Sequence, residues 1–319
     1  MKRALQLFTM ILFIGLAAFV SPKLQAQVYN YDPHVDEDLL GELERPRKLQ
    51  FGMRMGAMIA GGAPTAFYSG QGGFDLGDGS ANLYSIDERL NLGGANSYTR
   101  AQVLELLNVT DFYIPADGYP TPASYDPAVL MGVRVMQRFN LGNALIFDAD
   151  FIRLRSRAAW QLVTNLLPDQ GQGTEDRRDF GIFGEEERLQ LHLGYRTASP
   201  IDKSMSYVLG LGVNMVSTRI TDHYVVIEGQ GRSEEFDLIT TFNPNGQTGP
   251  ATGSLTGTSF GAYGRIGLEA YVPNGSGVEL TYRLGYDTIV LGREKFRALT
   301  HVVALTWLMP PPKISSLQM

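Results

Sequence analysis

The sequence of 319 residues contains no cysteine. An exported chain without disulfide bonds cannot be a small cross-linked scaffold, so it needs another source of rigidity. Beyond residue 26 no apolar stretch approaches 18 residues, which excludes a membrane-spanning helix from that part of the chain. Segments with helical periodicity are also almost absent. The sequence therefore has to build its rigidity from β-strands.

Sequence motifs for catalysis and cofactor binding are lacking as well. There is no G-x-S-x-G, no P-loop and no dinucleotide fingerprint. The four histidines, His34, His192, His223 and His301, are dispersed and show no metal-ligand spacing. Residues 75–79 (DLGDG) faintly resemble a calcium loop but lack its fuller run of ligands. We therefore predict no enzyme activity, no cofactor and no metal.

The N-terminus has the pattern of a secretory signal. Lys2 and Arg3 precede an apolar run over residues 4–20, and a small residue, Ala26, follows after a polar break. A membrane anchor is the alternative, but it needs about 20 apolar residues. We predict a signal peptide over residues 1–26 that is cleaved near Ala26. With no cysteine near that site, a lipoprotein is excluded.

The mature chain is acidic. Cleavage removes Lys2, Arg3 and Lys23 and no acidic residue, so the formal net charge of −6 becomes −9. A charge of this sign argues against nucleic acid as a partner.

Eight stretches of the chain alternate between apolar and polar residues. Successive side chains of a strand point to opposite faces, so this alternation predicts strands with one apolar face. In the first stretch Leu49, Phe51 and Met53 alternate with Gln50 and Arg54. The eight stretches cover residues 48–60, 128–139, 143–157, 189–196, 207–215, 260–272, 278–285 and 297–308.

Two further features favour a transmembrane barrel over a soluble sandwich, which also alternates. The stretches hold about ten residues, as tilted membrane-spanning strands do. Short turns near residues 140–142, 199–200 and 274–275 alternate with longer segments, of which the longest has about 67 residues. Short turns on one side and long loops on the other are typical of outer-membrane barrels. We predict an all-β protein: an eight-stranded, antiparallel, up-and-down transmembrane barrel with long extracellular loops.

Aromatic residues mark the strand ends next to the short turns. Rings at one depth on the apolar face form an interfacial girdle in membrane barrels. The predicted periplasmic girdle consists of Phe51, Phe139, Tyr195, Tyr207 and Trp307.

The polar face predicts a charged lumen. An eight-stranded barrel is just wide enough to be filled by side chains, and buried charges must be paired. Two interpretations stay open: the charges form the structural core of the barrel, or they line a narrow path for ions or solutes, which closely packed pairs would obstruct. The predicted network consists of Arg54, Arg134, Arg138, Asp148, Asp150, His192, Arg196, Arg265, Glu269, Glu279 and Arg283, with Gln190 beside them.

Three segments lie outside the predicted strands. Residues 27–47 are acidic and predict a periplasmic N-terminal segment, either a tether or a docking peptide. The long loop 61–127 contains Val103, Leu104, Leu106 and Leu107, which predict one short helix. Its expected cap is Ser97 or Thr99, and the loop is either a lid packed on the barrel mouth or a ligand site. We predict a periplasmic tail over residues 309–319.

The residues between 48 and 308 resemble the small outer-membrane barrels of the OmpA/OmpX type, closest to the "outer membrane protein beta-barrel" families of Bacteroidetes-like bacteria. The resemblance rests on the alternating strands, the LQAQ signal end and FDADFIRLRSR. Many such barrels end on an aromatic residue, whereas here Trp307 lies twelve positions before the terminus. The resemblance implies the outer membrane as location and outer-membrane lipid as partner. It transfers no functional residue.

Three functions are compatible with these features of the sequence. The leading hypothesis is a non-catalytic outer-membrane barrel that acts in envelope structure, in surface binding or as an accessory of an envelope assembly with a protein partner. The second is a narrow passive channel. The third, a lipid-modifying barrel enzyme, would need a nucleophile and a base together near the rim. Asp222 and His223 are adjacent, but the sequence supplies no assured serine partner.

Overall fold

The computed structural model describes twelve parts of the chain. They are residues 49–71, 85–91, 98–120, 123–139, 142–165, 175–202, 204–239, 241–242, 248–249, 255–271, 276–292 and 294–310. Several predictions lie outside these residues: the signal peptide, the segment 27–47, the calcium-like residues 75–79, Ser97 and most of the tail.

Eight strands close into a ring. They are β1 (Leu49–Ala60), β4 (Ala128–Arg138), β5 (Asn143–Asn165), β6 (Glu175–Pro200), β7 (Met205–Gly229), β11 (Thr256–Tyr271), β12 (Gly277–Leu291) and β13 (Glu294–Leu308). Neighbours in the order β11-β12-β13-β1-β4-β5-β6-β7 are hydrogen-bonded, and β7 pairs with β11 to close the ring. Every pairing in the ring is antiparallel. The predicted eight-stranded barrel is confirmed.

Shorter elements occupy the long connections. They are η1 (Ala63–Ser69), α4 (Ile86–Leu90), α5 (Tyr98–Leu107), β2 (Asp111–Tyr113), η3 (Ala116–Gly118), β3 (Ser124–Tyr125), β8 (Arg232–Asp237), β9 (Thr241–Phe242) and β10 (Thr248–Gly249). Among the residues that the structure describes, no helix is both long and apolar enough to cross a membrane.

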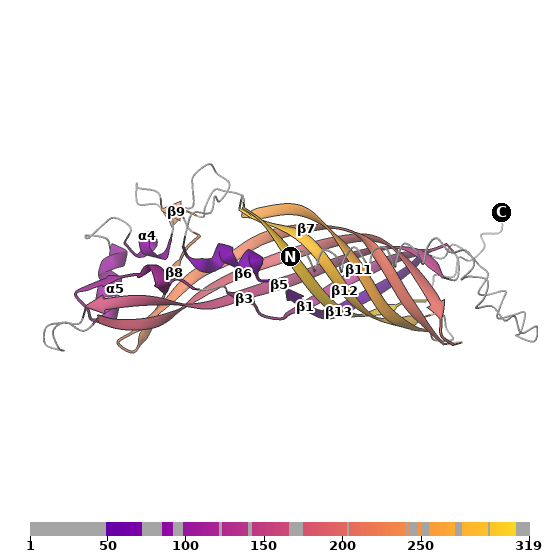
Figure 1. Ribbon diagram of the computed structural model, residues 1–319, viewed down its shortest axis with the longest axis horizontal. Coiled ribbons are helices and arrows are strands. Elements are labelled where there is room, and N and C mark those ends of the chain that lie inside the picture. Colours follow the sequence, from indigo (N-terminus) through magenta and orange to yellow (C-terminus); the bar gives the residue numbers. More distant parts are fainter. Residues whose placement is uncertain are drawn as a thin grey trace, which may run out of the picture. The chain divides into compact units, whose positions relative to one another are not determined.

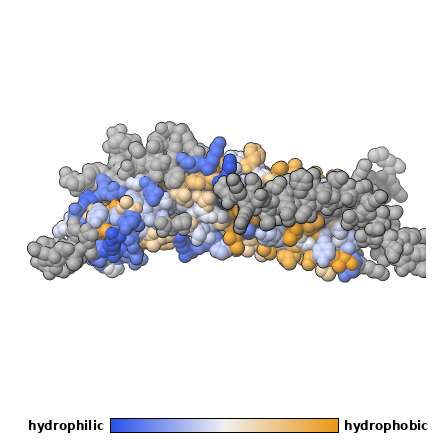
Figure 2. Space-filling view, viewed as in Figure 1, coloured by the Kyte–Doolittle hydropathy of each residue, from blue (hydrophilic) through white to orange (hydrophobic). Residues whose placement is uncertain are grey.

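The barrel wall is apolar outside and polar inside. On β1 the side chains of Phe51, Met53 and Met55 are exposed, whereas Gln50 and Arg54 are buried in the lumen. The other ring strands repeat this pattern. An outer surface of this kind is stable only in lipid, because in water so large an apolar patch would drive association. Figure 2 shows the apolar colour gathered over this part of the molecule.

Three strands are longer than the alternation predicted. β5, β6 and β7 have 23, 26 and 25 residues, and Figure 1 shows them running on beyond the ends of the other ring strands. The segments after the third and the fifth predicted strand, which we predicted as loops, are therefore largely strand, and the β5–β6 connection shrinks to residues 166–174. The alternation continues in these segments, but the outward-facing residues are polar, so the segments lack the apolar outer face of a membrane-spanning strand.

We call this continuation the extension. It consists of β5 from Arg153, β6 up to Glu187 and β7 from Arg219, together with α4, α5, β2, η3, β3 and β8. β8 pairs with β7, and both β2 and β3 pair with β5. Together they form a sheet that leaves the barrel on one side of its rim.

The extension has a hydrophobic core of its own on the face that continues the lumen. α5 packs on β7, and α4 packs on α5. The predicted short helix is α5, but Thr99 lies inside it and does not cap it. The buried core consists of Ile86, Leu90, Val103, Leu106, Leu107, Val109, Phe112, Trp160, Leu162, Phe180, Ile182, Val225, Ile227, Phe236 and Leu238.

Candidate functional site

The lumen holds all eleven residues of the predicted charge network. Each side chain of the set takes part in at least one ion pair or hydrogen bond with another member. Arg138 is the member nearest the outside, with a side chain that is 21% exposed. Inward-facing positions of the ring strands supply the network, so strands far apart in the sequence are joined across the lumen.

Glu279 on β12 is the centre of one layer of the charge network. Its carboxylate accepts hydrogen bonds from Arg134 at 2.5 Å and from Arg196 at 2.8 Å, and Arg265 lies 3.7 Å away. Arg196 also pairs with Glu269, which in turn accepts from Arg138 at 2.6 Å. The partners come from β4, β6 and β11, so this one carboxylate ties opposite walls of the ring together.

Asp148 and Asp150 on β5 form the next layer. Asp148 accepts from Arg134 at 2.6 Å and pairs with Arg54. Asp150 accepts from Arg283 at 2.9 Å, and the same guanidinium lies 2.6 Å from His192 Nε2. In a low-dielectric interior such charge-assisted bonds are strong, and losing one partner is costly.

The buried charges of the barrel balance. Six arginines and six carboxylates among the described residues are buried on the inner face of the ring strands. They are Arg54, Arg134, Arg188, Arg196, Arg265, Arg283, Asp148, Asp150, Glu186, Glu269, Glu279 and Asp287. A balanced set can be buried without a large uncompensated charge.

Beyond the charge network, on the side of the extension, apolar side chains block the lumen. η1 packs against β5, β6, β12 and β13, which places it inside the ring. Phe67 and Tyr68 of η1 join a cluster of buried side chains from the strands around them. Tyr68 donates a hydrogen bond to Glu186 at 2.9 Å. Gly184 allows this approach, because a Cβ there would lie 2.3 Å from the Tyr68 ring.

Several residues of the lumen were not among those predicted. Glu186, which accepts from Arg188 at 2.6 Å, shares the even-numbered register of Gln190 and His192, so following the alternation further back would have found both. Tyr68 carried no such signal, because η1 lies in a loop and only the tertiary structure brings it inside the ring. Asp287 was also missed; Asn214 donates to it at 2.6 Å and Thr300 at 3.0 Å.

The predicted aromatic residues all lie on the outer face of the barrel. Phe51, Phe139, Tyr207 and Trp307 are exposed, and Tyr195 is half-buried.

His223 and Asp222 point to opposite faces of the extension. His223 is buried, with its ring 5.3 Å from that of Tyr68 and 6.2 Å from that of Phe67, whereas Asp222 is exposed. Burial lowers the pKa of His223 to about 4, against a smaller raising effect of Asp237. The two residues are therefore not arranged as an acid–base pair. Within the described parts of the chain, no group of three or more possible ligands is placed to hold a metal ion.

Comparison with known proteins gives matches to solved structures alone. No protein-family model matches the chain, and no curated protein matches it. The attachment invasion locus protein Ail of Yersinia pestis is 9% identical, with 83% of this chain and 99% of that chain covered and a TM-score of 0.30. Neisserial surface protein A is also 9% identical, with 81% and 96% covered and a TM-score of 0.34.

The outer membrane protein OprG from Pseudomonas aeruginosa is 10% identical, with 83% of this chain and 98% of that chain covered and a TM-score of 0.32. These matches are small outer-membrane β-barrel proteins. At such identities and TM-scores they carry no argument about what this chain does.

Proposed function

We propose that the protein is a closed, non-catalytic barrel of the outer membrane whose extension binds at the cell surface. The observation that carries this proposal is the double obstruction of the lumen. Paired charges around Glu279 fill one level, and η1 with its apolar neighbours fills the next. A lumen filled in this way serves as a core, so the parts left to interact are those outside it.

The orientation of the barrel follows from its connections. β1 begins and β13 ends on the side of the barrel where β4 and β5, β6 and β7, and β11 and β12 are joined by short turns. The extension rises from the opposite side. Because outer-membrane barrels have short periplasmic turns and longer extracellular loops, the extension faces the outside of the cell.

Electrical recording in planar bilayers tests the closed lumen. We expect the purified, refolded protein to add no stepwise conductance, while a general porin that is inserted by the same procedure conducts. Reproducible current steps from the wild-type protein would contradict the proposal.

A narrow passive channel is the second candidate, and one observation favours it. Arg265 is buried, yet its three guanidinium nitrogens have no hydrogen-bond partner among the described residues, and its nearest carboxylates are 3.7 and 3.8 Å away. Buried donors that are left without a protein acceptor bind water, and water beside Arg265 would open a path through the charge network. If wild-type current steps appear, Arg265→Met should change their size, which a leak around the outside of the barrel would not do.

Location in the membrane has a simpler test. A closed barrel that resists detergent runs faster on a denaturing gel before boiling than after it, and it fractionates with the outer membrane. Recovery of the protein as a soluble periplasmic monomer would contradict the whole proposal. The lipid-modifying activity is tested separately, by comparing the mass of lipid A with and without expression, and we expect no change.

A further inference from the structure

We propose that a hollow on the outer face of the extension binds the sugar portion of a glycolipid of the outer leaflet. The proposal rests on the proposed function in one respect, namely that the extension faces the outside of the cell. It assigns to that surface a site and a ligand class.

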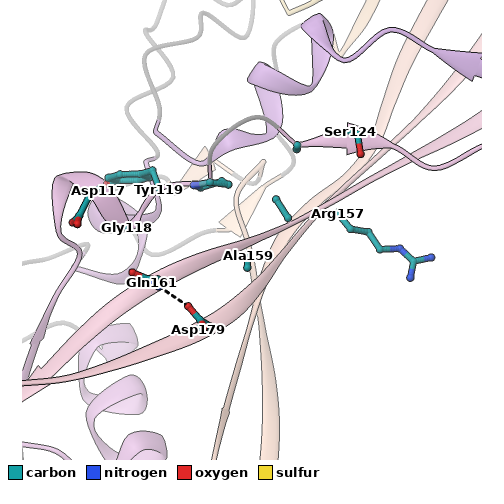
Figure 3. Close-up of a pocket in the computed structure, with 11 residues that line it drawn as sticks. Asp117, Gly118, Tyr119, Ser124, Arg157, Ala159, Gln161 and Asp179 are labelled. Carbon is teal, nitrogen blue, oxygen red and sulfur yellow. Dashed lines mark hydrogen bonds between the residues drawn. The ribbon is translucent and has the colours of Figure 1, made fainter.

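The hollow lies where the η3 segment crosses the outer face of β5 and β6. It is an open depression with a volume of about 390 Å³. Figure 3 shows Asp117 and Tyr119 on one side and Ala159, Gln161 and Asp179 on the other. Gly118 lets η3 approach this closely, because a Cβ there would lie 2.7 Å from the Gln161 carbonyl oxygen. The floor of the hollow is low at Ala159, because its side chain is small.

The groups around the hollow suit a ligand with many hydroxyls. Asp117 and Asp179 offer carboxylate acceptors, Gln161 both donates and accepts, and Ser124 adds a hydroxyl. Gln161 donates to Asp179 at 2.9 Å, which holds both side chains at the edge of the hollow.

Two properties of the hollow exclude other ligand classes. Its charges have both signs, since Arg177 donates a hydrogen bond to Asp117 at 3.1 Å, so it is not built for a polyanion or a polycation. It offers little apolar wall, so it is not built for a hydrocarbon. Tyr119 supplies one aromatic side chain, against which the C–H face of a sugar ring can pack.

The position of the hollow points to the source of the sugar. Phe151 is the last exposed large apolar residue on the outer face of β5, and Arg153, Arg155 and Arg157 follow it on the same face. Eight residues separate Phe151 from Ala159, which is about 26 Å along a strand at about 3.3 Å per residue. The hollow therefore stands above the apolar band, at the height of the saccharides that outer-leaflet glycolipids carry.

The residues between the band and the hollow also suit a lipid headgroup. Arg153 and Arg155 share a single carboxylate, that of Glu185. Arg219 lies on β7, two strands away from β5. Within the described residues, no carboxylate lies within 4 Å of its guanidinium. Phosphates near the membrane surface would find donors here. The continuity from band to arginines to hollow favours a membrane glycolipid over a soluble glycan.

A tryptophan behind the hollow provides the readout. Trp160 follows Ala159 in the sequence, is fully buried on the opposite face and donates to the Gly181 carbonyl at 3.3 Å. The chain has two tryptophans, so a Trp307→Phe variant leaves Trp160 as the only one. Its emission is to be measured in detergent while lipopolysaccharide from the host strain, the oligosaccharide released from it, isolated lipid A, or dextran is added.

We expect the released oligosaccharide to shift the Trp160 emission saturably and lipid A alone to leave it unchanged. In the same background, Ala159→Phe fills the hollow and Asp179→Ala removes an acceptor, and each should weaken binding at least tenfold. Glu105→Gln is the matched control, because Glu105 is an exposed acid of the extension on α5, away from the hollow, and it should bind as the parent does.

Three results would overturn the inference. They are no response to any saccharide, an equal response to lipid A, and a response to dextran alone. The last result would mean that the ligand is a soluble glycan and not the sugar of a membrane glycolipid. Equal binding by Ala159→Phe would overturn the site. A conducting bilayer with a responsive Trp160 would refute only the closed lumen. A silent bilayer with an unresponsive Trp160 would refute only the glycolipid site.

Discussion

Three strands, β5, β6 and β7, run through both the barrel and the extension, but the two regions bury opposite kinds of side chain. In the barrel part of β5, Phe151 is exposed and Asp150 is buried; a few residues later Arg153 is exposed and Leu154 is buried. The alternation keeps its period, but the two faces exchange their chemistry. The surrounding solvent explains the exchange, because lipid favours an apolar exterior and water favours a charged one.

The largest effect is expected from breaking the charged core of the barrel. Glu279→Gln leaves Arg134 and Arg196 without their shared carboxylate, and removing one partner of a buried ion pair costs about 3–5 kcal/mol. Urea unfolding in detergent, followed by the gel shift of the folded form, measures the loss. Glu105→Gln, at an exposed acid of the extension, should cost less than about 0.5 kcal/mol. Equal urea midpoints for the two variants would show that the lumen network does not stabilise the barrel.

Placing the same charge on the outer face of each region sharpens the comparison. Leu193→Arg puts a cation into the exposed apolar band on β6 and should cost about 2–4 kcal/mol of folding free energy into bilayers. Val226→Arg puts it on the outer face of the extension, opposite Glu235, and should cost less than about 0.5 kcal/mol. Similar costs at both positions would place the membrane boundary elsewhere.

The extension should also be the region that responds to acid. The pKa of His223 is about 4 in the folded state, below the usual 6.5, so the opened state binds the proton first as the pH falls. The folded extension is fully stable above about pH 6.5, and its free energy of local unfolding falls by up to about 3 kcal/mol on the way to pH 4. Amide hydrogen exchange of β7 and β8 measures this. His223→Phe, which suits the neighbouring rings, should remove the pH dependence; the same dependence in the variant would assign it to another group.

The smallest effect is expected from an ion pair on the water-exposed face. Arg153 pairs with Glu185, but its side chain is 52% exposed. Surface pairs of this kind contribute less than about 1 kcal/mol. Arg153→Ala should therefore leave the urea midpoint almost unchanged, in contrast to Glu279→Gln. A loss as large as that of Glu279→Gln would show that this pair is shielded from water.

The alternation predicted the ring, because a period of two decides which side chains share a face without any reference to distant residues. It predicted the lumen residues for the same reason. It failed where the environment changed along one strand. The outward positions Arg155 and Arg157 of β5 are polar, so a search for apolar outer faces ended too early and took strand for loop.

The hollow was not predictable from the sequence either. Asp117 and Asp179 are separated by about sixty residues, and they meet because β2 and β3 hold the η3 segment along β5. No local pattern records that pairing.

The sequence by itself determined the faces of the strands, their number and the closed ring, since these depend on neighbours one or two positions apart. The tertiary structure alone decided which charges meet across the lumen, that η1 fills its mouth, and where the strands leave the membrane. Arg134 and Glu279 are 145 positions apart and come together only when the ring closes. The stagger of the whole sheet, rather than any single stretch of chain, sets that contact.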